Sequence, residues 1–445
     1  MLEVLNTLLW GPGTLTLILG TGAWLTLRTG GFPQRNLGRA LGLSLGREAR
    51  KKGKNGVSPF GSLMTALAST VGTGNIVGVA AALVSGGPGA LVWMELAALL
   101  GLAAKFAECM LAVKYRRVRR DGTRWGGPMA VMETRLGSAG AVLGRFYALF
   151  ALLMAFAMGA MAQSGALADT FSAAFTLPRW RVGLVTAALA LTILLGGIRR
   201  IADISTVLVP VMALLYLGGG LAVILGNLRR LPEAVTLMLR CAVAPEATLG
   251  GALGIVTRRE ALRWGVARSV FSNEAGLGSA AITAACADTE DPVKQGLISM
   301  TGVFFDTMVI CAVTGLAICC SGTLGAADGN GRPLTGAALT LRAFETVLGP
   351  LAPWLIGVAL GLFAFTSVLG CAVQAETTAS YLLGPEAVRP CRVLYGLAVF
   401  AGAVIPMATV LQLADLANAL MAFPNLVCLL LLSDEIAGEC GRKER

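Results

Sequence analysis

The fold of this 445-residue chain is decided by two short polar stretches, STVGTGN at residues 69–75 and FSNEAGLGS at residues 271–279. Each stretch interrupts an apolar run that is long enough to cross a membrane. Glycine and small polar residues in the middle of such a run predict a helix that unwinds at bilayer depth. Because unwound backbone inside a membrane must line a cavity or contact protein, the two stretches predict a binding site near the bilayer midplane.

The composition places the rest of the chain in a membrane. Hydrophobic residues make up 56% of the chain, charged residues only 14%, and the mean hydropathy is +0.74. An ordinary soluble core cannot bury this much apolar surface, so we expect an all-α polytopic membrane protein. The hydropathy pattern predicts about eleven spans, at 4–27, 60–84, 90–113, 142–171, 182–195, 204–224, 261–285, 295–320, 354–382, 391–405 and 410–431.

Lysine and arginine set the expected orientation, since they collect on the cytoplasmic side of membrane proteins. The net charge of +11 is concentrated in residues 28–58, residues 114–135 and the C-terminus, which all fall on one side of the predicted bundle. We therefore expect a cell-membrane protein, in the plasma or inner membrane, with its N-terminus outside and its C-terminus in the cytoplasm. A nucleic-acid surface is disfavoured, because these basic segments flank spans and lack interleaved aromatic residues.

The composition also excludes several kinds of chemistry. The chain has no histidine, which removes imidazole metal sites, Ser-His nucleophiles and histidine proton relays. It has no P-loop motif, and it has no histidine that could activate a serine nucleophile, so we do not expect an enzyme. The cysteines that fall inside predicted spans are expected to act as small packing residues: Cys109, Cys311, Cys319, Cys320, Cys371 and Cys428.

The number of spans indicates an inverted repeat. If the first span is an extra N-terminal helix, the other ten form two groups of five, and each group opens with an interrupted helix. An odd number of spans inverts the second group relative to the first, as in many secondary transporters. The alternative is that the glycines only permit close helix packing. The expected parts are an accessory helix with a basic loop at 1–59, a first repeat at 60–228, an extracellular connection at 229–260, a second repeat at 261–432 and a tail at 433–445.

The chemistry of two unwound stretches suits an amino acid. Free amides at the start of one half-helix bind a carboxylate, and free carbonyls at the end of the other bind an ammonium group or Na⁺. Gly72 and Gly74 let a ligand approach the backbone, and the Asn75 amide serves either partner. In the ninth span, the adjacent hydroxyls of Thr366 and Ser367 are oxygen donors for a cation. The alternative for these hydroxyls is a hydrogen bond to the carbonyl one turn earlier.

An ordered set of motifs resembles the alanine or glycine:cation symporter family. It includes GTGNI at 72–76, GGPGA at 86–90, FSNEAGLGS at 271–279 and MAFPNL at 421–426, and the resemblance extends over residues 60–432. Each motif alone is weak, but the ordered set is specific. The resemblance implies a leucine-transporter-like fold and symport of a small neutral amino acid, of the alanine or glycine class, with Na⁺ or sometimes H⁺.

The resemblance also implies which residues form the site. The substrate carboxylate would lie near the backbone of Thr73, Gly74 and Asn75, with further substrate contacts from Gln163, Phe271, Ser272, Asn273, Gly276 and Cys371. The coupling Na⁺ would be held by Ala68, Val71, Phe363, Thr366 and Ser367. Cys371 stands where family members usually have tryptophan, which leaves more room for a larger substrate such as glutamine.

Ionisable residues inside spans are costly and often functional. Lys105 and Glu108 are three residues apart on one helical face, and we expect them to pair. Arg268 and Glu274 are expected to form a second pair that fixes the unwound stretch.

Two further buried carboxylates bear on the alternative functions. If H⁺ rather than Na⁺ drives uptake, Asp306 and Glu376 are the candidate proton-binding groups. For Asp306 we favour a hydrogen bond to the end of a broken helix. A channel is the other alternative, and it predicts flux without accumulation.

Overall fold

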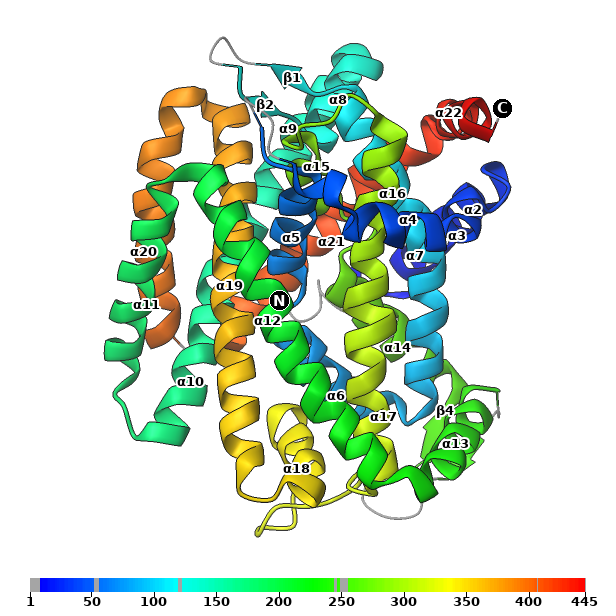
Figure 1. Cartoon of the computed structure of the whole chain (residues 1–445), viewed down its shortest axis with the longest axis vertical. Helices are drawn as coiled ribbons and strands as arrows, with labels where there is room; N and C mark the ends of the chain where they lie inside the picture. Colours follow the sequence, from blue (N-terminus) through cyan, green and yellow to red (C-terminus); the bar gives the residue numbers. More distant parts are fainter. Residues whose placement is uncertain are drawn as a thin grey trace.

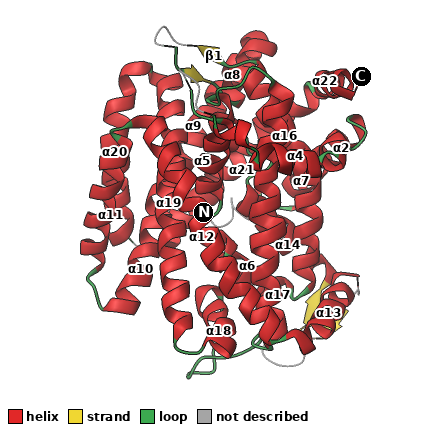
Figure 2. Ribbon diagram, viewed as in Figure 1, coloured by secondary structure: helices red, strands yellow, loops and turns green. Residues whose placement is uncertain are grey.

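The computed structural model describes residues 9–51, 56–118, 122–243, 246–248, 255–405 and 407–444. These residues form helices throughout, with two short antiparallel hairpins in the connections (Figure 2). The elements up to the first hairpin and the long helices after it are α2 (Pro12–Arg28), α3 (Phe32–Arg35), α4 (Leu37–Leu45), η1 (Arg47–Arg50), α5 (Pro59–Thr70), η2 (Thr73–Asn75), α6 (Val77–Gly86), α7 (Gly89–Lys114), β1 (Arg117–Val118), β2 (Arg124–Trp125), α8 (Pro128–Arg135), α9 (Gly137–Met154), η3 (Ala155–Ala162), α10 (Gln163–Phe175), α11 (Arg179–Leu194) and α12 (Gly197–Gly226).

The second part of the chain repeats this helical character. Its elements are η4 (Leu228–Arg230), α13 (Leu231–Val243), β3 (Glu246–Thr248), β4 (Ile255–Thr257), α14 (Arg258–Asn273), α15 (Ser279–Ala285), α16 (Pro292–Val303), η5 (Phe304–Cys311), α17 (Ala312–Ser321), α18 (Gly336–Leu348), α19 (Leu351–Leu383), η6 (Pro385–Ala387), α20 (Val388–Val404), α21 (Met407–Leu431) and α22 (Ser433–Glu444).

The all-α multi-span architecture predicted from the sequence is confirmed. Among the described residues, seven helices are long and apolar enough to cross a membrane, and eight if the bent pair α5–α6 counts as one span. The other predicted spans correspond to the shorter α2, α11 and the pair α14–α15. The beginning of the first predicted span, residues 4–8, lies outside the described residues.

The first polar stretch breaks its helix as predicted. Ser58 begins α5 by accepting a hydrogen bond from the Gly61 amide, and Pro59 occupies the first turn, where its missing N–H costs nothing. The helix ends at Thr70, and α6 continues after a bend of 62°. The single turn η2 bridges the two halves, so the residues of the first polar stretch lie in the bend.

The second polar stretch also breaks its helix. Between α14 and α15 the chain runs through left-handed backbone, with φ of 52° at Glu274, 85° at Gly276 and 79° at Gly278. Glycine adopts this conformation without the steric cost that a side chain brings, which explains two of the three positions. Glu274 adopts the same conformation with a side chain, which is sterically unfavourable. Non-glycine residues with positive φ mark functional or tightly constrained backbone.

The two broken helices lie together in the middle of the molecule, with the long helices around them (Figure 1). They run in opposite directions: α5 starts at the end that carries the first hairpin, whereas α14 starts at the end that carries α13. Helix α14 packs along α7 and α6, and α19 packs along α5. The approach of α19 is very close, because a β-carbon at Gly370 would stand 2.4 Å from the Ser69 amide nitrogen.

Two spans contain a wide π-helical segment, η3 between α9 and α10 and η5 between α16 and α17. Such segments displace the helical register by one residue and are frequent at functional sites. The second one carries Asp306, which is fully buried.

One end of the molecule gathers most of the basic connections, and we call it the basic end. It holds the first hairpin, α4, the start of α16 and the tail helix α22 (Figure 1). Ion pairs tie the tail to this end: Lys114 lies 2.7 Å from Glu435, Lys443 lies 2.6 Å from Asp291, and Arg28 pairs with Asp434.

The opposite end contains two connections between spans, α13 with the second hairpin and the segment that carries α18. Helix α13 and the β3–β4 hairpin occupy most of the expected connection at 229–260, although residues 244–245 and 249–254 lie outside the described residues. Residues 321–350 fold in part into α18, whose Phe344 stacks on Tyr216 of α12 with ring centroids 5.6 Å apart.

The tail contact predicts a dependence on pH. Burial raises the pKa of Glu435, but the hydrogen bonds from Lys114 and Tyr115 outweigh it, so the pKa lies below the ordinary 4.5. A carboxylate with a depressed pKa stabilises the docked tail above its ordinary pKa and loses this effect as the pH falls through the docked value. A spin label at position 438, which has open space around it, should therefore become more mobile below pH 4.5.

The variant Glu435→Gln should mobilise the same label at pH 7, because it removes the charge that holds Lys114 and Arg135. The matched control is Glu386→Gln, an exposed acid in η6, which should leave the label unchanged. A label equally immobile in Glu435→Gln would contradict the role of this carboxylate.

Candidate functional site

The two breaks meet at one buried carboxylate. Asp306 accepts a hydrogen bond of 2.7 Å from the Asn75 side-chain amide on the first break. It accepts another of 2.7 Å from the hydroxyl of Ser272, the penultimate residue of α14 before the second break. Asn75 also donates to Ser272 at 3.0 Å, so the three side chains form a closed triangle. All three are buried, at 0–2% exposure.

Asn75 also fixes the shape of its own break. Its side-chain oxygen accepts a hydrogen bond of 3.0 Å from the Gly72 amide, three residues earlier. The amides of Thr73 and Gly74, the first residues of η2, have no acceptor within their own helix. These two amides are therefore the backbone donors that the first break leaves for another group.

The third wall of the site comes from α19. A β-carbon at Gly72 would stand only 2.8 Å from the Ser367 hydroxyl, which places this hydroxyl against the first break. Ser367 donates to the Phe363 carbonyl at 2.9 Å, and Thr366 donates to the carbonyls of Leu362 and Phe363. The hydroxyls thus make the bond one turn back that was the alternative interpretation, while their oxygen lone pairs stay available to a cation.

The fourth wall comes from α10. The Gln163 side-chain oxygen lies 3.4 Å from the Thr73 hydroxyl and would lie 3.5 Å from a β-carbon at Gly72. On the other side, the Phe271 ring lies 3.8 Å from where a β-carbon of Gly74 would stand. The structure therefore brings together the predicted substrate residues Thr73, Gly74 and Gln163 with Phe271 around the first break.

Of the other predicted site residues, some lie near the first break and one, Cys371, lies against η3. Ala68, Val71 and Phe363 are buried where α5 faces α19, and Asn273 donates to the Thr307 hydroxyl at 3.0 Å. Cys371 instead packs against η3, where a β-carbon at Gly159 would stand 2.2 Å from that of Cys371. Its side chain fills a contact between helices.

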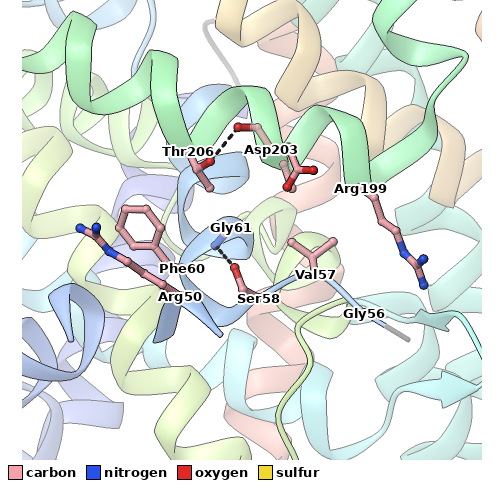
Figure 3. A pocket seen from close by; sticks show the side chains of 10 residues that line it. Arg50, Gly56, Val57, Ser58, Phe60, Gly61, Arg199, Asp203 and Thr206 are labelled. Atoms are coloured by element: carbon pink, nitrogen blue, oxygen red, sulfur yellow. Dashed lines mark hydrogen bonds between the residues drawn. The ribbon is translucent and has the colours of Figure 1, made fainter. Parts of the chain in front are cut away.

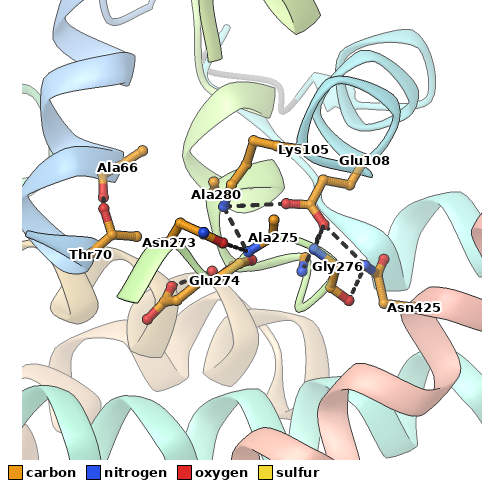
Figure 4. A network of polar contacts seen from close by, with 12 residues as sticks. Ala66, Thr70, Lys105, Glu108, Asn273, Glu274, Ala275, Gly276, Ala280 and Asn425 are labelled. Atoms are coloured by element: carbon orange, nitrogen blue, oxygen red, sulfur yellow. Dashed lines mark hydrogen bonds and ion pairs between the residues drawn. The ribbon is translucent and has the colours of Figure 1, made fainter. Parts of the chain in front are cut away.

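Gly276 lies in a second polar network, which Figure 4 shows. The Glu108 carboxylate accepts hydrogen bonds from the amides of Gly276 at 3.2 Å and Gly278 at 3.0 Å. Lys105 lies 3.4 Å from Glu108 and donates to the Glu274 carbonyl at 3.1 Å. The predicted pairing of Lys105 with Glu108 is confirmed.

The expected pair between Arg268 and Glu274 does not form. Glu274 accepts from the Ser279 hydroxyl, and Arg268 stacks on the rings of Trp264 and Phe271, with its guanidinium carbon 5.6 and 5.4 Å from the ring centres. The physical reason is the direction of the chain: the left-handed turn at Glu274 directs its side chain toward α15 and away from the preceding turns of α14.

Glu376 is engaged elsewhere. It forms a two-pronged ion pair with Arg392 of α20, with both N···O distances 2.8 Å. This bidentate pair occupies both oxygens of the Glu376 carboxylate. Of the two carboxylates considered for proton binding, Asp306 is therefore the one that lies at the site.

Two cavities are lined in part by residues of the broken helices. One, of about 310 Å³, lies between the start of α5 and α12 near the basic end, and Figure 3 shows Arg50, Arg199 and Asp203 around it. None of its lining residues belongs to the predicted site. The other, of about 180 Å³, is lined by Arg268, Phe271 and Asp415, so the aromatic ring beside Gly74 forms part of its wall.

This arrangement defines a class of protein: a multi-span bundle with two broken helices that meet at a buried polar centre is a secondary transporter of the leucine-transporter type. The profile of the sodium:alanine symporter family matches residues 1–441. The chain belongs to that family, which is a family of transporters and not of enzymes.

Individual relatives agree with this assignment. The chain is 40% identical over 441 residues to the sodium/alanine symporter AgcS of Methanococcus maripaludis, covering 99% of this chain and 96% of the relative. It is 36% identical to the probable sodium/glutamine symporter GlnT of Bacillus subtilis, covering 97% and 87%. The crystal structure of MhsT in complex with L-phenylalanine is similar with a TM-score of 0.60 at 14% identity, covering 85% and 90%. The predicted leucine-transporter-like fold is therefore confirmed.

Sequence reasoning missed one residue of the site. Asn425 of α21 donates to Glu108 at 3.1 Å and to the Gly276 carbonyl at 2.9 Å. It lies in the motif MAFPNL, which contributed to the family resemblance, but nothing in the sequence indicated its contact with a stretch about 150 residues earlier.

The geometry predicts a contrast between two neighbouring glycines. Gly72→Ala should destabilise the protein by about 1–3 kcal/mol, because the new methyl group would press on Ser367. Gly74→Ala should leave the stability nearly unchanged, because its methyl group meets only Phe271, at an ordinary contact distance of 3.8 Å. Thermal unfolding of the two purified variants in one detergent tests this, and equal melting temperatures would contradict the described packing.

Proposed function

We propose that this protein is a Na⁺-coupled symporter that carries a small neutral amino acid across the cell membrane by alternating access. The observation that carries the proposal is the joining of the two breaks by Asn75, Ser272 and Asp306 beside free amides of the first break. The names of two relatives, a sodium/alanine symporter and a probable sodium/glutamine symporter, support the same substrate class and ion.

The substrate would bind through both of its charged groups. Its carboxylate takes the amides of Thr73 and Gly74, and Gln163 contacts its polar groups from α10. Phe271 covers the site from the side of the cavity that also contains Arg268, and this cavity is the proposed entry route. Ser272, Asn273 and Gly276 complete the predicted set around the second break, and Cys371 on α19 is the remaining predicted substrate residue.

The Na⁺ ion would bind where α5 meets α19. The carbonyls of Ala68 and Val71 at the end of the first half-helix are oxygen donors, and Thr366 and Ser367 add hydroxyl oxygens near the Phe363 carbonyl. Because Ser367 lies against Gly72, an ion there ties α19 to the break that holds the substrate. Substrate and ion then stabilise the same arrangement, and their coupling is reciprocal.

The coupling provides enough free energy for accumulation. Moving one positive charge with a zwitterion through a membrane potential of about 100 mV supplies roughly 2.3 kcal/mol. A tenfold Na⁺ gradient adds about 1.4 kcal/mol, so together they allow accumulation on the order of several hundredfold. A channel has no such coupling and only equilibrates its solute.

The proposed orientation puts the N-terminus outside and the basic end in the cytoplasm, following the charge distribution. The proposed parts are the accessory helix and loop at 1–59, the repeats at 60–228 and 261–432 around an extracellular connection at 229–260, and the tail at 433–445. Which amino acid fits best depends on the space around Phe271 and η3, with alanine and glycine as the first candidates and glutamine as the larger one.

Uptake into proteoliposomes tests the proposal. Purified protein is reconstituted, and labelled alanine, glycine and glutamine are offered with an inward Na⁺ gradient or with K⁺ in its place. We expect saturable accumulation with Na⁺, and exchange of labelled for unlabelled substrate. Uptake that is independent of Na⁺, is driven by a proton gradient and is lost in Asp306→Asn would instead support the H⁺-coupled alternative.

The double variant Thr366→Ala, Ser367→Ala tests the ion site. Removing both hydroxyls takes two oxygen donors from the proposed Na⁺ site, so the Na⁺ concentration for half-maximal uptake should rise at least tenfold. The matched control is Thr377→Ala on the same helix, whose hydroxyl bonds only the Val373 carbonyl. An unchanged Na⁺ requirement in the double variant would place the ion elsewhere.

Gly74→Ala tests the substrate site. Since its methyl group is compatible with folding, a loss of substrate binding in this variant would come from blocked approach to the backbone. We expect at least a tenfold rise in the substrate concentration for half-maximal uptake, while the melting temperature stays near that of the parent protein. Normal uptake by Gly74→Ala would show that the substrate does not approach this residue.

A further inference from the structure

The second break is held by an ion pair that belongs to neither broken helix. Lys105 and Glu108 lie on consecutive turns of α7, with side chains 3% and 0% exposed. Lys105 binds the Glu274 carbonyl on the α14 side of the break, and Glu108 binds the amides of Gly276 and Gly278 on the α15 side. One charged pair thus occupies backbone groups on both sides of the break (Figure 4).

These contacts replace hydrogen bonds that an unbroken helix would make. At a helix end the carbonyls and amides lack intrahelical partners, and in a membrane no water replaces them. A cation suits the carbonyl end of a helix, and an anion suits the amide end. The order of Lys105 and Glu108 matches the polarity of the break, whereas the reverse order would repel at both ends.

Asn425 and Gly101 also lie against the second break. Asn425 of α21 donates to both Glu108 and the Gly276 carbonyl, which satisfies the peptide group between the two occupied amides. Helix α7 approaches the break closely at Gly101, where a β-carbon would stand 3.1 Å from the Ala275 β-carbon. The peptide groups of Gly276 are therefore already occupied by the protein.

We propose that Lys105 and Glu108 are positioning residues. They hold the second break in the conformation in which Ser272 is hydrogen-bonded to Asn75 and Asp306. They act through the backbone of residues 274–278 and do not touch the proposed substrate at the first break. Because Glu108 occupies the amides of Gly276 and Gly278, these two amides are not offered to the substrate, whereas those of Thr73 and Gly74 are. The transport consequence rests on the proposed function, but the positioning itself does not.

Hydrogen exchange measures the positioning without any ligand. In Glu108→Gln, the charge that holds the amides of Gly276 and Gly278 is gone, so the peptide covering residues 274–279 should exchange at least tenfold faster than in the parent protein. The control is Glu376→Gln, which also converts a carboxylate in an intramembrane ion pair into an amide but touches neither break. It should leave exchange in this peptide unchanged.

A milder variant covers the case in which Glu108→Gln does not fold. Asn425→Ala removes one donor to Glu108 and leaves the ion pair in place, so it should speed exchange of the same peptide at least threefold. Unchanged exchange in Asn425→Ala and in any folded Glu108→Gln protein would overturn the proposal.

Uptake distinguishes positioning from direct contact and from a general loss of stability. If fewer molecules hold the competent break, the half-saturating concentrations of Na⁺ and amino acid in Glu108→Gln rise together, by the same factor. A rise for one ligand only, or a lower maximal rate alone, would overturn the positioning role. If the parent protein shows no Na⁺-dependent uptake, the proposed function fails, while the exchange experiment still decides the role of Glu108.

Discussion

The hydrogen bonds that Asp306 accepts from Asn75 and Ser272 join the two halves of this transporter at its centre. A carboxylate buried in a membrane is costly unless its oxygens are satisfied, and Asn75 and Ser272 supply two of the hydrogen bonds that satisfy them. A hydrogen bond to a charged group contributes about 1.5–3 kcal/mol, and a lost partner costs more. The position of each break therefore depends on the position of the other.

The two breaks are stabilised in different ways, and the difference assigns them different tasks. The first break is held from within, by the bond between Asn75 and the Gly72 amide, which leaves the amides of Thr73 and Gly74 for a ligand. The second break is held from outside by Lys105, Glu108 and Asn425, which use the peptide groups around Gly276. The first break thus provides backbone amides for binding. The second break provides side chains whose backbone is held in place by Lys105, Glu108 and Asn425.

The sequence predicted the features that follow from local composition. Both breaks, the spans and the pairing of Lys105 with Glu108 could be predicted, because glycine content, hydropathy and helical spacing are properties of neighbouring residues. The bond between Asp306 and a broken helix was also expected, and the structure confirms it. Its particular partners and the contacts of Asn425 could not be predicted, since they depend on which distant helix faces which. Arg268 and Glu274 show the limit of spacing arguments: a left-handed residue between two side chains redirects one of them, and no count of residues per turn reveals it.

The claim that the cargo site lies between the two breaks is tested most directly by an experimental structure determined with alanine and Na⁺. We predict alanine with its carboxylate within about 3.2 Å of the Thr73 or Gly74 amide nitrogen, with Asp306 still bonded to Asn75 and Ser272. Alanine bound away from residues 72–75, or an unbroken helix through either polar stretch, would contradict this assignment.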